Sequence, residues 1–258
     1  MTAELHNGDA VADAVPEICR LENVTMAFGG VKALDDVSLA LGAHTGITGI
    51  IGPNGAGKST CLNVVAGARR PTSGRVTVLG QQLTRSATST KVARRGVART
   101  FQIPRPFAAM SVRENVLVAV QASAPVRMSR AEQAVEELLE QIGLTSVAGQ
   151  LAGSLALASR KKLEVARAMA IQPRVLLLDE VFEGLSDTEI HEMVTILRGL
   201  DARGIRLVLV EHVLRALRQL ATELVVFEKG TVIAHGDVEE VLHDSRVQEA
   251  YLGFGGAA

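Results

Sequence analysis

Hydrophobic and polar residues alternate in short runs between residues 18 and 80. This alternation is typical of β-strands that bury one face, and it occurs in ICRLENVTMAF, DVSLAL and GRVTVLG. The intervening run ITGIIGPNGAGKSTCLNVVAG passes from apolar residues through a glycine-rich stretch into a helical pattern. The pattern therefore predicts an antiparallel β subdomain beside a strand, a glycine-rich loop and a helix.

The period changes between about residues 94 and 170, where apolar residues recur at three- and four-residue spacing. SVRENVLVAVQA and SRAEQAVEELLEQIGL both show this helical spacing. Ser129 and Glu132 predict a capping box at the start of the second helix. This part of the chain is expected to form a helical subdomain.

Beyond residue 170, strands that are apolar throughout alternate with helical segments. The expected strands are RVLLLDE, IRLVLVEH, ELVVFE and TVIAHG, and the expected helices lie near DTEIHEMVTILRGLDARG and LRALRQLA. Strands without a polar face are typical of a mostly parallel sheet covered on both sides. The predicted fold class is therefore α/β, with a mostly parallel core sheet, an antiparallel β subdomain and a helical subdomain.

The composition is that of a packed globular protein, with 47% hydrophobic and 21% charged residues among 258. Lys and Arg (27) nearly balance Asp and Glu (28), so no broad basic field favours nucleic acid. No apolar run approaches the ~18 residues of a spanning helix, and no signal-peptide pattern occurs, so a cytoplasmic protein is expected. Residues 1–17 are predicted to be a flexible tail before one domain over 18–258. Cys19 and Cys61 lack metal-ligand spacing and are predicted to be buried thiols.

The segment GPNGAGKS fits the phosphate-binding pattern G-x-x-x-x-G-K-[ST], placed between a predicted strand and a predicted helix. Its glycines let backbone N–H groups turn toward phosphates at the positive end of the new helix. Lys58 adds a mobile positive charge, and Ser59 offers a hydroxyl to Mg²⁺. The motif predicts a P-loop NTPase. Its candidate nucleotide-binding residues are Gly52, Asn54, Gly55, Gly57, Lys58, Ser59 and Thr60.

Two acids, Asp179 and Glu180, end the apolar run VLLLDE. Alone they would be a solvated strand end. Beside a phosphate loop they lie where open α/β sheets bind ligands, at the carboxyl ends of the strands. Asp179 is then suited to hold Mg²⁺, and Glu180 to polarise a water for attack on the γ-phosphate of ATP.

With these motifs in order, residues 18–253 resemble the ATP-binding subunits of ABC transporters. RTFQIPRPFAAMSVRENV is similar to the Q-loop of that family, which implies that Gln102 reaches Mg²⁺ and water while the following residues meet a membrane partner. EGLSDTE is similar to the D-loop, with Ser186 and Asp187 facing a second subunit. VLVEHV places His212 at the position of the histidine that contacts the γ-phosphate in the family.

One branch of the family, the ATPases of branched-chain (hydrophobic) amino acid uptake, is resembled more closely. TMAFGGVKALDDVSL carries an aromatic residue before two glycines, and this implies that Phe28 stacks on adenine. The C-terminal segment ending in EAYLG also resembles that branch.

The segment SLALASRKKLEVARA occupies the position of the family's signature motif, L-S-x-G-[QG]. In the family this motif binds the γ-phosphate held by the opposite subunit. The aligned residues here are 155–159, so Ala156 lacks the signature hydroxyl and Ala158 lacks the freedom of glycine. A shift of one residue would let Ser159 supply the hydroxyl. Lys161, Lys162 and Arg167 are expected on the solvated face of the following helix.

The resemblance implies an ATP- and Mg²⁺-dependent ATPase that powers import through two membrane permease subunits, at the cytoplasmic face of the membrane. We expect a heterodimer with a second ABC ATPase and an indirect link to a solute-binding protein. No nucleic acid is expected as a partner. The altered signature leaves open a regulatory, non-transport nucleotide-binding protein with weak hydrolysis. An ABC ATPase of DNA repair or translation would carry coiled-coil insertions or two cassettes. A kinase or GTPase would leave Gln102, Asp187 and His212 unexplained.

Overall fold

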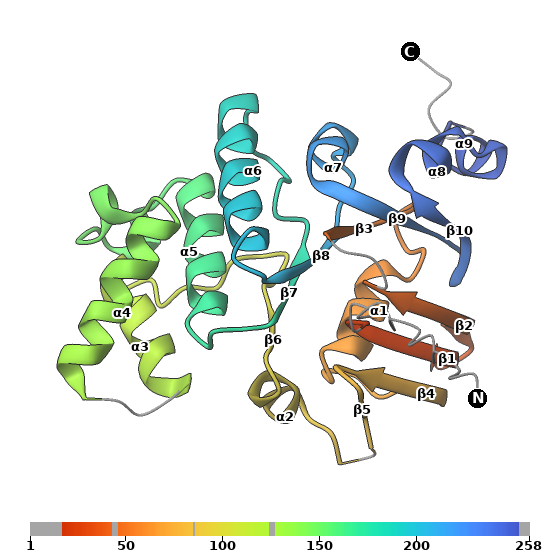
Figure 1. Cartoon of the computed structure of the whole chain (residues 1–258), viewed down its shortest axis with the longest axis horizontal. Helices are drawn as coiled ribbons and strands as arrows, with labels where there is room; N and C mark the ends of the chain where they lie inside the picture. Colours follow the sequence, from red (N-terminus) through yellow and green to blue (C-terminus); the bar gives the residue numbers. More distant parts are fainter. Residues whose placement is uncertain (1–16, 43–45, 85, 124–126, 253–258) are drawn as a thin grey trace, which may run out of the picture.

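The computed structural model describes residues 17–42, 46–84, 86–123 and 127–252. Figure 1 shows a small sheet formed by the N-terminal strands, a larger sheet crossing the middle of the molecule, and a group of helices beyond it. Apart from Glu17, the predicted N-terminal tail lies outside the described residues. None of the helices in the described ranges is long and apolar enough to span a lipid bilayer.

Among the described residues, the larger sheet has six strands in the order β10-β9-β3-β8-β7-β6. They are β3 (Ile47–Ile51), β6 (Val97–Arg99), β7 (Val175–Asp179), β8 (Arg206–Val210), β9 (Ala221–Glu228) and β10 (Thr231–Asp237). All neighbours pair in parallel except β10, which pairs antiparallel with β9 at the edge. The expectation of a mostly parallel core sheet is confirmed.

Alternate side chains of the buried strands enter two different hydrophobic clusters. In β7, Leu176 and Leu178 join the cluster that contains most of the helices. Val175 and Leu177 join a second cluster, which includes the small sheet and helix α1 (Lys58–Val65). Since successive side chains of a strand point to opposite faces, the sheet is covered on both sides as its apolar strands predicted.

The smaller sheet pairs antiparallel throughout, in the order β2-β1-β4-β5. Its strands are β1 (Cys19–Phe28), β2 (Val31–Leu41), β4 (Ser73–Val78) and β5 (Gln81–Gln82). Cys19 on β1 and Cys61 on α1 are free, buried thiols, as predicted. Burial raises the pKa of both, that of Cys61 to about 12.

Helices α3 (Val112–Ser123), α4 (Met128–Gln141) and α5 (Leu157–Met169) form the group at the far side of the larger sheet (Figure 1). Their apolar faces meet in one cluster through residues such as Val116, Val135 and Val165. The short helix α2 (Ser89–Arg94) and strand β6 precede them. Although β6 lies within residues 94–170, it belongs to the larger sheet, and the limits of a separate helical subdomain stay a prediction.

The C-terminal part adds α6 (Asp187–Asp201), α7 (Leu214–Leu220), α8 (Val238–His243) and α9 (Ser245–Leu252). Helix α6 begins with a capping box, in which Glu189 accepts the Ser186 backbone N–H at 2.8 Å and Ser186 Oγ accepts the Glu189 N–H at 3.4 Å. The box predicted at Ser129 and Glu132 is wrong. The N-cap of α4 is Arg127, two residues before Ser129, and no side chain caps the helix start, so Ser129 lies inside the first turn.

We expect Ser186→Ala to lower the free energy of unfolding by about 1 kcal/mol, because it removes the oxygen that caps α6. Ser129→Ala is the matched control, since Ser129 is exposed within α4 and caps nothing. Urea unfolding of both variants measures the difference. Equal losses from the two changes would contradict the assignment of the caps.

Candidate active site

The loop between β3 and α1 is built on glycines that no other residue replaces without strain. Gly57 lies directly before α1 with φ +105°, and a Cβ there would approach the Ala33 carbonyl oxygen to 2.4 Å. Gly52 has φ +147°, and its Cβ would lie 2.1 Å from the Phe227 carbonyl oxygen. Both contacts are with backbone, so a side chain would displace β2 or β9. The sequence places glycine where the loop passes closest to the two sheets.

Lys58, the first residue of α1, folds back over the loop. Its Nζ donates to the carbonyl oxygens of Gly52 at 2.7 Å and Pro53 at 2.9 Å. Burial lowers the pKa of Lys58, while the carboxylates of Glu180 and Asp179 oppose this shift. A cation therefore stands inside the loop, with two acids near it. Of the remaining loop candidates, Asn54 and Gly55 are exposed at the tip, and Thr60 is half-buried in the first turn of α1.

Asp179, the last residue of β7, is buried and bonded from two sides. Ser59 Oγ donates to its Oδ1 at 3.2 Å, and the Arg99 guanidinium donates to its Oδ2 at 2.9 Å. Arg99 also donates to the Asn63 side chain on α1. Arg99 ends β6 beside β7, and its role was not predicted from the sequence. Its position three residues before Gln102 was a weak signal for contact with Asp179, because no strand was predicted at residues 97–99.

Glu180 follows Asp179 and meets Gln102, which comes from the segment after β6. The Gln102 Nε2 donates to the Glu180 Oε2 at 2.5 Å. Two residues predicted from separate motifs are thus in direct contact. Together with Asp179, they line one small cavity, which Lys161 of α5 also borders.

Three further candidates are exposed side chains at the ends of other elements. Phe28 ends β1 with 47% of its surface exposed. His212 follows β8 and is also exposed. Asp187 begins α6 and pairs with Arg215 of α7, yet its side chain stays 80% exposed. Their positions leave all three accessible to a ligand or a second chain.

Helix α5 begins inside the altered signature segment. Ala156 is its N-cap, and no side chain caps the helix start. Leu155 and Ala158 are buried, whereas Ala156 and Leu157 are exposed. Ser159 is the third residue of the helix and half-buried. Helix α5 therefore starts at an exposed stretch of chain, without a signature hydroxyl at Ala156.

The expectation that the basic residues of α5 form a solvated face is wrong. Lys161 is 5% exposed, and its Nζ donates to the Glu180 carbonyl oxygen at 2.7 Å. Arg167 donates to the Arg105 carbonyl oxygen at 3.0 Å, and Lys162 pairs with Glu192 of α6 at 2.7 Å. Long basic side chains can bury their stems when their charged ends find oxygen partners. Helical periodicity alone does not reveal such partners.

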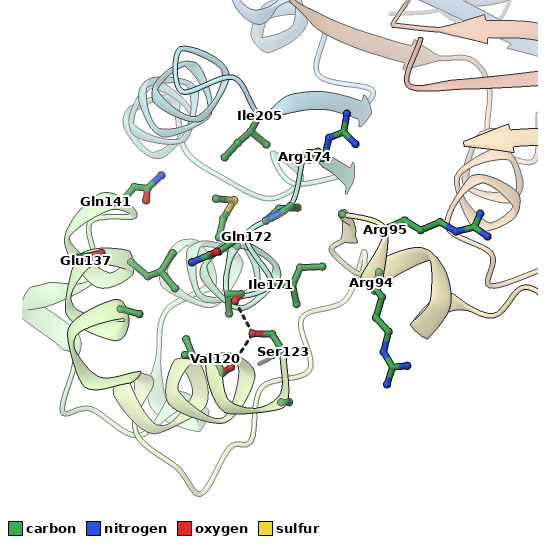
Figure 2. Close-up of a pocket in the computed structure, with 18 of the residues that line it drawn as sticks. Arg94, Arg95, Val120, Ser123, Glu137, Gln141, Ile171, Gln172, Arg174 and Ile205 are labelled. Atoms are coloured by element: carbon green, nitrogen blue, oxygen red, sulfur yellow. Dashed lines mark hydrogen bonds between the residues drawn. The ribbon is translucent and has the colours of Figure 1, made fainter. Parts of the chain in front are cut away.

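A hollow of about 980 Å³ lies at the amino ends of the parallel strands, opposite the end of the larger sheet that carries Asp179 and Glu180. It is lined by residues that directly precede β6, β7 and β8, including Gly96, Arg174 and Ile205. Figure 2 shows Arg94 and Arg95 extending away from the helices of this hollow. The hollow is thus separate from the cluster around Asp179 and Glu180.

Comparison with known proteins matches this chain to one large family and one of its branches. Residues 34–183 match the family described as ABC transporter. Residues 231–253 match the family described as branched-chain amino acid ATP-binding cassette transporter.

Two curated relatives cover nearly the whole chain. The high-affinity branched-chain amino acid transport ATP-binding protein BraF of Pseudomonas aeruginosa is 33% identical, over 92% of this chain and 98% of its own length. The corresponding protein LivG of Escherichia coli is 34% identical, over 90% of this chain and 96% of its own length. Both predicted likenesses, to the ABC family and to its branched-chain branch, are confirmed.

Two solved structures agree in fold as well as in sequence. A nucleotide-free ATP-binding cassette of an ABC transporter superposes with a TM-score of 0.80 at 31% identity, covering 91% of this chain and 98% of the other. The ADP conformation of an ATP-binding cassette also gives a TM-score of 0.80 at 31% identity, covering 92% and 99%. Family, relatives and fold agree over the segments that hold the phosphate loop and the acids, and the chain therefore belongs to the ABC transporter family as a nucleotide-binding ATPase.

Proposed function

We propose that this chain is the ATP-hydrolysing subunit of an ABC importer for branched-chain or other hydrophobic amino acids. The observation that carries the proposal is the direct contact of Gln102 with Glu180, beside the bond between Ser59 and Asp179. These contacts bring three separate motifs together at the carboxyl ends of β3, β6 and β7. The curated relatives named for branched-chain amino acid transport support the class of solute.

The loop from Gly52 to Ser59 would hold the phosphates of ATP. Its backbone N–H groups and the start of α1 supply donors and a positive dipole. Lys58 now donates to two carbonyl oxygens of the loop, and it would exchange these for phosphate oxygens. Phe28 would stack on adenine, and His212 would contact the γ-phosphate. Asp187 would face the second ATPase subunit.

Ser59, Asp179 and Gln102 fit a Mg²⁺ site. Their hydroxyl, carboxylate and amide oxygens are hard ligands of the kind Mg²⁺ prefers, and Ser59 Oγ lies 3.2 Å from Asp179 Oδ1. When bound, Mg²⁺ neutralises charge on the transferred phosphoryl group. Arg99 holds Asp179 from the side of β6, which fixes the carboxylate for this role.

Glu180 would act as the acceptor for a proton of the attacking water. Its Oε2 already accepts a hydrogen bond from the Gln102 amide, so its carboxylate is oriented toward the segment that carries Gln102. A carboxylate held in this way can orient a water for in-line attack. Gln102 and Glu180 would therefore share the positioning of that water.

Replacing Glu180 with Gln removes the proton acceptor and leaves Lys58 and Ser59 in place. ATP binding is expected to persist, while turnover falls by about a hundredfold or more. Measurement of ATP binding and hydrolysis in the assembled complex tests this. Glu183→Gln, in the same turn but exposed, is the control. Near-normal hydrolysis by Glu180→Gln would rule out this assignment.

Exposed apolar side chains that flank and follow Gln102 in the chain support docking to two membrane permease subunits at the cytoplasmic face of the membrane. We define the docking surface as Phe101, Ile103 and Phe107 together with Leu151, which bridges to Ser111, and each of the four is about half exposed or more. Asn115 fixes the backbone of Phe107, accepting its N–H at 2.8 Å and donating to its carbonyl oxygen at 3.1 Å. Apolar side chains on a fixed backbone are typical of a binding surface.

Phe107→Glu is expected to weaken co-purification with the permeases and to spare ATP binding, because it places a charge on the apolar surface. Met128→Glu is the control, since Met128 is equally exposed but lies on α4. Co-purification and transport measure the effect. Full assembly and transport by Phe107→Glu would contradict the docking surface.

The altered signature supports a heterodimer with a second ABC ATPase. In a head-to-tail dimer the segment at Ala156 and Ala158 would serve the ATP bound by the partner, and the phosphate loop here would face the partner's signature. Loss of one hydroxyl contact to a charged phosphate costs roughly 1.5–3 kcal/mol and slows a site about tenfold to more than a hundredfold. A homodimer would carry this defect in both sites.

We expect Lys58→Ala to remove most turnover of the heterodimer, because it destroys the site that faces an intact signature. The equivalent lysine change in the partner ATPase should cost less. The test compares turnover of both variant complexes and of this chain alone. Robust turnover by the isolated chain, or equal losses from the two lysines, would mean that the altered segment is a working signature.

A further inference from the structure

The turn that carries Glu180 is held in a conformation that its sequence disfavours. Glu180 has φ +53°, in the left-handed region, where a non-glycine residue is strained. Such strain persists only where surrounding contacts fix the backbone. The contacts that fix the backbone at Glu180 therefore also determine the direction of its carboxylate.

Two of these contacts come from the carboxyl end of β8. The Val210 carbonyl oxygen accepts the Glu180 N–H at 2.9 Å. Glu211 Oε1 accepts the Phe182 N–H, also at 2.9 Å. Glu211 is fully buried. Burial of its carboxylate costs free energy, and the bond with the Phe182 N–H offsets part of that cost. Glu211 therefore fixes the turn after β7 through its bond with the Phe182 N–H.

The third contact comes from α5. Buried Lys161 donates from Nζ to the Glu180 carbonyl oxygen at 2.7 Å. Both backbone polar groups of Glu180 are therefore bonded, the carbonyl oxygen by Lys161 and the N–H by Val210. Lys161 extends from the helix that begins in the signature segment, four residues after its first residue, Leu157.

Lys161 and Glu211 also stabilise each other's charge. Burial raises the pKa of Glu211 to about 7, and the Lys161 ammonium opposes this rise. Burial lowers the pKa of Lys161, and Glu211, Glu183 and Glu180 oppose that fall in turn. An ammonium and a carboxylate buried on two sides of one turn are costly to keep unless each is compensated.

We propose that Lys161 and Glu211 are positioning residues for Glu180. Lys161 holds the turn at the Glu180 carbonyl oxygen and Glu211 holds it at the Phe182 N–H, so that the Glu180 carboxylate faces the reacting water. The inference rests on the proposed role of Glu180 as proton acceptor. It assigns Lys161 a task within its own chain, separate from any contact that the signature segment makes across a dimer. Both residues would act through the backbone of the turn.

The first test compares Lys161→Met, Lys161→Arg and Lys162→Met in the assembled complex. Lys161→Met keeps the length of the side chain and loses the donor, and misplacement of a reacting group by about 1 Å can cost roughly a hundredfold. We expect kcat to fall about ten- to a hundredfold with KM for ATP little changed, and Lys161→Arg to recover most of kcat. Lys162→Met, which loses the bond to Glu192 of α6, should match the parent.

Glu211 gives a second, independent pair. Glu211→Gln retains an oxygen that can accept the Phe182 N–H, whereas Glu211→Met does not. The Gln variant is expected to keep much more kcat than the Met variant. Hydrogen exchange of the amides at 180–182 in the full chain, without ATP, should speed up in Lys161→Met and Glu211→Met but not in Lys162→Met.

A normal kcat in Lys161→Met would overturn the inference, as would a loss through KM alone or an Arg variant no better than Met. Glu180→Gln is measured alongside. An inactive Glu180→Gln beside a fully active Lys161→Met removes the positioning role only. Near-normal turnover by Glu180→Gln removes the base assignment, and with it the role that positioning would serve.

Discussion

Parallel pairing of β3, β8 and β7 is the constraint on which the whole candidate site depends. Ile50 of β3 pairs with Val210 of β8, and Val210 pairs with Asp179 of β7. The phosphate loop, Glu211 and Glu180 therefore leave the sheet at the same level. Because a slip of one residue would turn every buried side chain to the other face, the two hydrophobic clusters fix this register. Burial energy thus sets the alignment that the chemistry uses.

Helix α5 connects this edge of the sheet to the segment that follows Gln102. Its Glu164 accepts the Arg105 N–H at 3.0 Å, and its Arg167 donates to the Arg105 carbonyl oxygen. One turn earlier, Lys161 bonds the backbone of Glu180. The proposed permease surface and the proposed base are therefore attached to one rigid helix. A displacement of that helix would move both ends of the contact between Gln102 and Glu180.

The fold and most of the site could be predicted where a motif determines its own local structure. The phosphate loop needs glycine at close backbone approaches, and the two acids stand at the end of an otherwise apolar strand. Both features can therefore be predicted from the sequence. Strand β6 was missed because three residues are too few to show a period, and Arg99 was missed with it. The roles of Lys161 and Arg167 depend on oxygens distant in the chain. The start of α4 lies two residues before the predicted cap, a difference that periodicity does not resolve.

The buried thiols have a practical consequence for labelling chemistry. Cys19 and Cys61 are the only cysteines of the sequence, and both lie in the cluster between the sheets. Maleimides and iodoacetamides react with thiolates. Burial shields both thiols from solvent and raises the pKa of each, which keeps them protonated at neutral pH. A cysteine introduced at an exposed position would then be the reactive one in the folded chain. Fluorophores or spin labels could be attached there with the two native cysteines left in place.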